Sequence, residues 1–94
     1  MTVKEMLELG KPYGVTGISI GGCIKGSPIH LGEPGAMRKR GHAHAGKHCD
    51  NQGCICFKAH TPERIGKRLF WHEVAHIYRP SWTETQCNKW ANRQ

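Results

Sequence analysis

The distribution of glycine is the feature that most limits how this chain can fold. Eight of its twelve glycines lie between Gly10 and Gly35, and three of its five prolines lie in the same stretch. In a helix, glycine costs about 1 kcal/mol and proline about 3 kcal/mol relative to alanine, so this stretch cannot be helical. We therefore expect helices only near the two ends of the chain, with short strands between them.

Both ends carry helical patterns. Residues 2–9 have apolar residues at helical spacing. A second helix is expected to begin with Thr61 as its N-cap and Pro62 as its first residue. It should end near Tyr78, because Pro80 pushes the residue before it out of helical geometry. A third helix is expected from there toward the C-terminus.

Short strands are expected in the middle of the chain. Thr16–Ile20 and Cys23–Lys25 have strand-forming residues between glycines. Residues 38–45 and 54–58 are expected to pair as a hairpin, because the turn-forming residues Asp50–Gly53 lie between them.

Length and charge limit the class of protein. The 94 residues predict one small domain, in which 1–36 form the N-terminal helix and glycine-rich segment and 37–94 form the core. The formal charge of +7 favours an anionic partner such as nucleic acid, although a solvated basic face explains it equally well. The N-terminus has no apolar run of signal-peptide or membrane-span length. We therefore expect no membrane partner, a cytoplasmic location and reduced cysteines.

The run "HEVAH" within the second predicted helix contains two histidines four residues apart. Such residues differ by about 40° around a helix and about 6 Å along it, so His72 and His76 can reach one zinc ion. Glu73 is turned by about 100° from His72, which suits a general base acting on a zinc-activated water. The alternative is that these histidines are ordinary polar residues on a helix face.

The segment "FWHEVAHIY" resembles the active-site helix of the HExxH zinc metallopeptidases, the zincins. The wider run "GHAHAGKH…GCICFKA…RLFWHEVAHIYRPSWTE" is similar to small bacterial and phage proteins of SprT-like or minimal-zincin type, in which an "AHAH" strand and an "ICV"-like strand precede the motif helix. The resemblance covers about residues 40–92. It implies an α+β, minimal zincin-like fold, in which a small hairpin or sheet packs on the motif helix and a C-terminal helix. It also implies zinc-dependent hydrolysis of peptide bonds.

A catalytic zinc needs a third protein ligand and an open position. SprT-like proteins use a histidine after the motif, and this chain has none after His76. Gluzincins use a glutamate followed four residues later by Asp or Asn, and Glu84 and Asn88 match that spacing. The run "ETQCNKWA" also resembles the "ExEANxFA" run of ImmA/IrrE-like peptidases. Glu84 is therefore the expected third ligand with Asn88 behind it, and Cys87 is the alternative because thiolate binds zinc well.

Two capping boxes compete near that glutamate. Ser81 with Glu84 would occupy the Glu84 carboxylate, whereas Thr83 with Gln86 would leave it free at the start of the last helix. The sequence leaves both open.

The apolar run "GCICFKA", Gly53–Ala59, directly precedes the motif helix. Alternation puts Cys54 and Cys56 on one side of the strand and Ile55 and Phe57 on the other. Zincins hold a peptide or protein substrate as an added strand at a sheet edge beside the metal helix, and this run is expected to provide that edge. The alternative is that both of its sides are packed.

Further residues are candidates for polarising a substrate carbonyl. His42 and His44 share a face if their segment is a strand, and Tyr78 follows the motif closely. For each histidine the alternative is a surface residue.

Two other classes of function compete with the peptidase. A structural zinc module that binds nucleic acid would combine the basic run 38–40 with a cluster of cysteines and histidines, although the C-x4-C-x-C spacing differs from the paired C-x2-C of common zinc fingers. The cluster consists of His42, His44, His48, Cys49, Cys54 and Cys56. The remaining class is a zincin-fold accessory protein that binds metal without cutting peptides.

Overall fold

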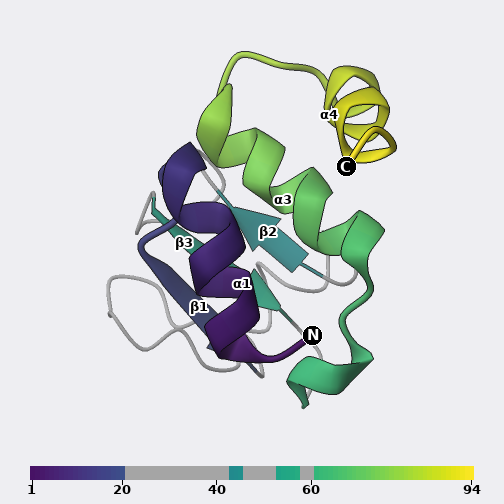
Figure 1. The fold of residues 1–94 in the computed structure, drawn as a ribbon. Coiled ribbons are helices and arrows are strands. Elements are labelled where there is room, and N and C mark those ends of the chain that lie inside the picture. Colours follow the sequence, from purple (N-terminus) through teal and green to yellow (C-terminus); the bar gives the residue numbers. More distant parts are fainter. Residues whose placement is uncertain (21–42, 46–52, 58–60) are drawn as a thin grey trace.

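The computed structural model describes residues 1–20, 43–45, 53–57 and 61–94. In these ranges the chain forms three α-helices, two short 3₁₀ turns and a three-stranded sheet with the strand order β1-β3-β2 (Figure 1). This mixture of helices and strands agrees with the α+β class expected from the sequence. No helix in the described ranges has the length and apolar character needed to cross a membrane.

Helix α1, Val3–Gly10, confirms the predicted N-terminal helix. Its start is fixed by a capping box: Glu5 N donates to Thr2 Oγ1 (3.1 Å), and Thr2 N donates to Glu5 Oε1 (2.9 Å). The 3₁₀ turn η1, Lys11–Tyr13, then leads to Gly14, whose φ of +99° lies in the left-handed region that favours glycine. This turn reverses the chain into the first strand.

The sheet contains β1, Gly17–Ile20, β2, Ala43–Ala45, and β3, Cys54–Phe57. Strand β1 confirms the strand expected at 16–20, and the antiparallel pairing of β2 with β3 confirms the described part of the expected hairpin. Strand β1 pairs with β3 in parallel. The strand expected at 23–25 lies outside the described residues.

Strand β3 lies in the centre of the sheet, which corrects one expectation. The run "GCICFKA" was expected to offer an edge to substrate, but β3 is paired with β1 on one side and with β2 on the other. Its backbone hydrogen-bonding groups are therefore already used. The alternative interpretation, in which both sides of the strand are packed, agrees with the burial of all four of its residues.

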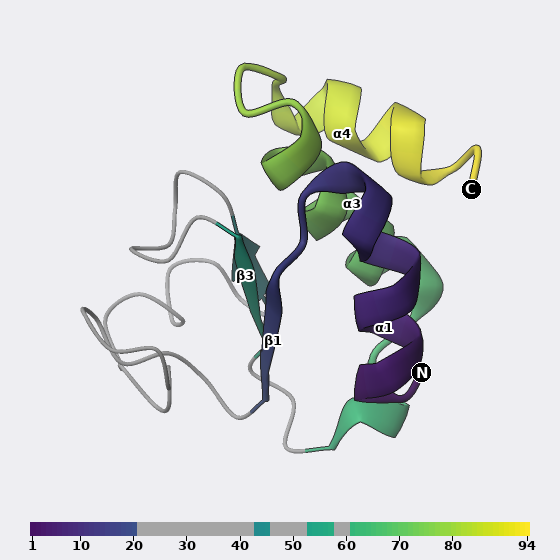
Figure 2. The ribbon, with the colours of Figure 1, turned by 60° about the vertical axis from the view of Figure 1, so that its left-hand side comes forward.

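The two faces of β3 have different environments. Ile55 and Phe57 belong to the main hydrophobic core, and Figure 2 shows α1 and α3 on one side of the sheet. Cys54 and Cys56 alternate with them and face the other side, as the strand pattern predicted. The core consists of Met6, Val15, Ala45, Ile55, Phe57, Ile65, Phe70 and Val74.

Helix α3, Lys67–Tyr78, begins later than predicted. Thr61 precedes only the 3₁₀ turn η3, Pro62–Arg64, and its side chain makes no capping hydrogen bond. Ile65 and Gly66 are extended, with ψ of 117° and 156°, and Ile65 is buried in the core. Packing of Ile65 therefore interrupts the helix before it restarts at residue 67. Its end at residue 78 agrees with the prediction.

Helix α4, Glu84–Ala91, packs against α3. Its N-terminus uses the second predicted capping box: Gln86 N donates to Thr83 Oγ1 (3.2 Å), and Thr83 N donates to Gln86 Oε1 (2.8 Å). Aromatic rings join α3, α4 and η1, since Tyr13 makes edge contacts with Trp71, Tyr78 and Trp90 at centroid distances of 5.1–5.8 Å. These contacts fix α4 over α3.

Candidate metal centre

His72 and His76 project from the same side of α3. Their ring centroids are 4.8 Å apart with an interplanar angle of 81°, and their Nε2 atoms are separated by 3.2 Å. His76 is 4% exposed and the His72 side chain 14%. The helix therefore directs the same ring nitrogen of both residues toward one point, as the spacing in "HEVAH" predicted.

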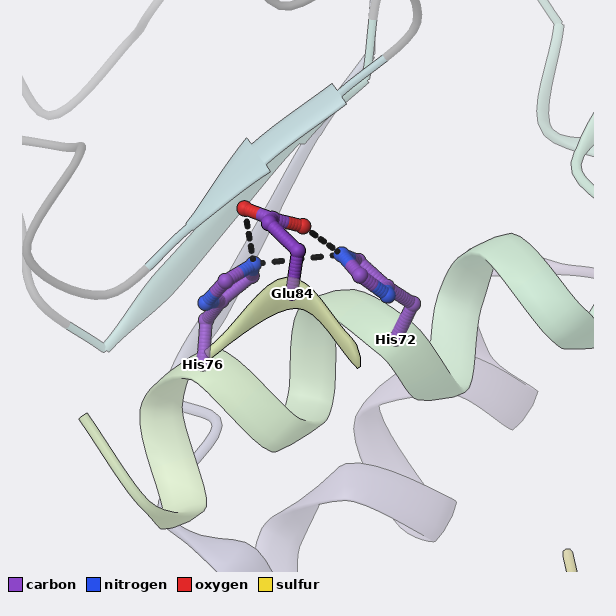
Figure 3. Close-up of side chains that lie close together, drawn as sticks. All are labelled: His72, His76 and Glu84. Atoms are coloured by element: carbon purple, nitrogen blue, oxygen red, sulfur yellow. Dashed lines mark hydrogen bonds and ion pairs between the residues drawn. The ribbon is translucent and has the colours of Figure 1, made fainter. Parts of the chain in front are cut away.

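The first residue of α4 supplies a carboxylate to that point. Glu84 Oε2 lies 2.7 Å from His72 Nε2, and Glu84 Oε1 lies 3.3 Å from His76 Nε2. Figure 3 shows the carboxylate across both imidazole rings. One possible ligand atom from each of the three residues lies within 4.8 Å of the other two. The Thr83 capping box leaves this carboxylate free to face the histidines.

The electrostatics of Glu84 favour the ionised carboxylate. Partial burial acts to raise its pKa, but the charges of His76 and His72 and the hydrogen bonds from both rings outweigh this and lower the pKa below its ordinary value. A carboxylate held ionised beside two imidazoles is a set of donors suited to a divalent cation.

The opposite nitrogen of each ring is contacted by α4. Asn88 Oδ1 lies 2.8 Å from His72 Nδ1, and Cys87 Sγ lies 3.7 Å from His76 Nδ1. A carbonyl oxygen only accepts, so His72 Nδ1 donates to Asn88 Oδ1, and the opposite nitrogen, Nε2, faces Glu84 and His76. This is the arrangement in which metal-binding histidines are usually held.

The short contact between His72 Nε2 and Glu84 is a place where a proton or a metal ion is shared. His72 Nε2 lies 2.7 Å from Glu84 Oε2, while Nδ1 of the same ring donates to Asn88. Two groups that only accept repel each other at this distance unless a proton or a metal ion lies between them. In tetrahedral zinc with bonds of 2.0–2.1 Å, ligand atoms are separated by about 3.3–3.4 Å. The 3.2 Å and 3.3 Å separations at His76 Nε2 are close to that value, whereas the 2.7 Å between His72 Nε2 and Glu84 Oε2 is the length of a direct hydrogen bond and would have to widen around an ion.

The predicted general base, Glu73, lies between the two histidines in the α3 sequence. It is 5% exposed, in contrast to the Glu84 side chain, which is 59% exposed. The two carboxylates at this end of the molecule therefore differ in environment, one enclosed by the fold and the other open to water.

Two of the other candidates are not brought into the cluster. Cys87, the alternative third ligand, contacts the Nδ1 side of His76, away from the three converging atoms. Tyr78 is turned by about 200° from His76 on the helix. Its ring packs against Tyr13 and Trp90, and its hydroxyl accepts from Arg79 Nη2. The structure therefore brings neither residue to the three converging atoms.

The remaining candidates are His44 and His42, which lie in and next to the short described range 43–45. His44 is in β2, in register with Cys56. His42 lies outside the described residues. The role predicted for either histidine in polarising a carbonyl stays a prediction.

The contact of Cys87 with His76 was not foreseen from the sequence. Glu84, Cys87 and Asn88 are spaced i, i+3 and i+4, which places them on one face of α4. This spacing is the signal from which the contact could have been found, because Glu84 and Asn88 were already assigned to the face that meets the histidines. On this face, Glu84 lies at the Nε2 atoms of both rings, and Asn88 and Cys87 lie at the Nδ1 atoms of His72 and His76.

Comparison of the chain with protein-family models, with curated proteins and with solved structures gives no match.

Proposed function

We propose that this protein is a zinc-dependent peptidase of minimal zincin type. His72, His76 and Glu84 bind the ion, and Glu73 acts as the general base. The observation that carries this proposal is the convergence of two imidazole Nε2 atoms and a carboxylate within 4.8 Å, with the opposite nitrogen of His72 held by Asn88. Two histidines and one glutamate are a ligand set of catalytic zinc sites.

The exposure of the centre supports a catalytic role for the ion. Catalytic zinc keeps an open position beside its three protein ligands, where it lowers the pKa of a water molecule to about 7. The exposed Glu84 side chain leaves the ligand cluster accessible from solvent, whereas His76 anchors it in the fold. Such a site combines a fixed ligand with access for a substrate.

Glu73 is assigned the proton transfer. It directly follows His72 on α3, so it cannot share the ligands' side of the helix but remains beside them. As general base it takes a proton from the attacking water and delivers it to the departing amine, a role worth about 10²–10⁴ in rate. Its burial, at 5% exposure, keeps competing bulk water away from the carboxylate.

The substrate is proposed to be an extended peptide or protein segment. Strand β2 packs against α3, and its side away from β3 has no partner strand within the described ranges. A peptide added along β2 would run beside the motif helix and pair through its backbone, which gives affinity with little sequence preference. We therefore propose β2, in place of β3, as the strand that pairs with the substrate.

The arrangement of the third ligand supports a gluzincin-like form of this fold. Glu84 begins α4, and Asn88, one turn later, contacts the first motif histidine at 2.8 Å. The link from His76 to Glu84 is only seven residues long, and the aromatic contacts among Tyr13, Tyr78 and Trp90 stabilise this tight helical hairpin.

Glu73→Gln is the variant that tests the function. Zinc-loaded wild-type protein is expected to cleave an unfolded protein or a mixed fluorogenic peptide library, and Glu73→Gln is expected to lose about 10²–10⁴ of that rate. Zinc content, measured by atomic emission, should remain at the wild-type level in the variant. Glu63→Gln in η3 serves as a matched control and should retain full rate.

Two outcomes would contradict the proposal. Equal cleavage by wild type and Glu73→Gln would assign the activity to a contaminant or another group. Stoichiometric zinc without cleavage of any unfolded substrate would leave a metal-binding accessory protein in place of the peptidase.

A further inference from the structure

The sheet face opposite the helices carries a pair of neighbouring cysteine side chains. Cys54 and Cys56 alternate with core residues on the central strand β3, and both are buried, at 3% and 0% exposure. Their Sγ atoms are 4.0 Å apart. Neither belongs to the cluster on α3 and α4, because that cluster lies on the helix side of the sheet.

We propose that Cys54 and Cys56 are two ligands of a second zinc site, separate from the His72–His76–Glu84 centre. Zinc binds thiolate sulfur at about 2.3 Å, and two ligands of a tetrahedral ion at that distance are separated by about 3.8 Å. The observed separation of 4.0 Å already matches this value. The strand therefore holds the two thiols, which share a hydrogen bond, at a separation that suits two ligands of one ion.

A disulfide between the same residues fits the strand poorly. Residues two apart in a strand have Cα atoms about 6.4–6.8 Å apart, at the upper limit for a disulfide, whose usual value is about 5.5–6 Å. Closing the bond would require β3 to bend. Because β3 is hydrogen-bonded to β1 and to β2, bending it would disturb both ladders. Metal binding is therefore favoured over oxidation at this pair.

The neighbouring strands provide suitable surroundings for an ion. In β1, the residues in register with Cys54 and Cys56 are Gly17 and Ser19, both small. A Cβ added at Gly17 would meet Cys54 Sγ at 3.7 Å, so glycine keeps this side of the sulfur uncrowded. In β2, the residue in register with Cys56 is His44, so a histidine occupies the same level of the sheet.

Binding at this site is an exchange of protons for metal. Two thiols each release one proton to solvent, and the two thiolates balance the charge of the divalent ion, with no oxidation or reduction. A buried site with sulfur ligands is typical of structural zinc. The ion would therefore hold the central strand in place and would take no part in the chemistry at α3.

Cobalt substitution tests the proposal separately from the proposed peptidase. Fully reduced, metal-free protein titrated with Co²⁺ should bind two equivalents, one of which gives the near-ultraviolet thiolate-to-cobalt charge-transfer band. Cys54→Ser/Cys56→Ser should lose this band and one equivalent. His72→Ala/His76→Ala should keep the band and lose the other equivalent. Cys87→Ser, which removes a buried thiol on α4, is the matched control and should keep the band.

A band that survives in Cys54→Ser/Cys56→Ser, or its absence in the wild type, would overturn the proposal while leaving the centre on α3 untouched. A measurement on the wild type covers the case in which the double variant does not fold. X-ray absorption of protein loaded with two equivalents of zinc should show zinc–sulfur scattering at about 2.3 Å. Scattering from nitrogen and oxygen alone would overturn the proposal.

Discussion

The two proposed metal sites of this molecule differ in donor type, exposure and supporting element. His72, His76 and Glu84 bring nitrogen and oxygen from two helices, and the Glu84 side chain is 59% exposed. Cys54 and Cys56 bring sulfur from the central strand and are almost completely buried. An open site with a carboxylate suits catalysis, and a closed site with thiolates suits structure. If both sites bind zinc, the sheet would lie between a catalytic ion on its helix side and a structural ion on its opposite face.

Removing Glu84 should have the largest effect on the helix-side centre. Glu84→Ala deletes the one anionic ligand, so zinc affinity at this centre should fall by well over the 10–100-fold that is typical of losing a residue behind a ligand. Competition with a chromophoric chelator measures that affinity. Cys87→Ala is the matched comparison from the same helix, and its zinc affinity should fall by no more than about 10–100-fold. Tight zinc retained in Glu84→Ala but lost in Cys87→Ala would reverse the assignment of the third ligand.

Metal removal should distinguish the two faces by stability. At zinc concentrations 100 times the dissociation constant, a site that binds only the folded state contributes about 2.7 kcal/mol to the free energy of unfolding. Removing zinc from wild type with a chelator should cost this amount for each site, measured by urea unfolding. In Cys54→Ser/Cys56→Ser only the contribution of the α3 centre should remain. If zinc removal costs the double variant as much free energy of unfolding as it costs the wild type, the two cysteines contribute no metal-dependent stability.

Asn88 should have an intermediate effect. Its carbonyl oxygen accepts from His72 Nδ1 at 2.8 Å and keeps Nε2 of that ring directed at the cluster. Asn88→Ala should lower zinc affinity about 10–100-fold, and Asn88→Asp should restore it because a carboxylate accepts the same hydrogen bond. Isothermal titration of metal-free protein with zinc measures both variants. Equal affinity in Asn88→Ala and wild type would refute the positioning role.

Thr83 should have the smallest effect. Its hydroxyl caps α4 by accepting from Gln86 N at 3.2 Å, and its replacement by alanine should cost about 1 kcal/mol of stability. Thr83→Ser keeps the hydroxyl and is the control for thermal unfolding. The sheet-side site should be unaffected, so a lower cobalt charge-transfer band in Thr83→Ala would show that the two faces are coupled.

The parts of this structure that local chemistry determines could be predicted from the sequence. The four-residue spacing of His72 and His76 is a property of any helix, and the choice of Thr83 as cap follows from its pairing with Gln86. Together they place Glu84 at the start of α4, opposite the histidines. The candidate centre is therefore readable from short-range patterns.

The parts that depend on long-range packing could not be predicted. The start of α3 is delayed because Ile65 is buried in a core built from distant segments. The central position of β3 depends on parallel pairing with β1, which lies about forty residues earlier in the chain. That pairing makes β3 the central strand among the described residues, and no local pattern in "GCICFKA" indicates it.

The most direct test of the central claim is the position of zinc in crystals of the metal-loaded protein, located by anomalous scattering at the zinc edge. We predict a peak within about 2.0–2.2 Å of His72 Nε2, His76 Nε2 and a Glu84 oxygen. A map without a peak between these three side chains, or with the ion bound by Cys87 and Glu84 turned toward solvent, would contradict the account.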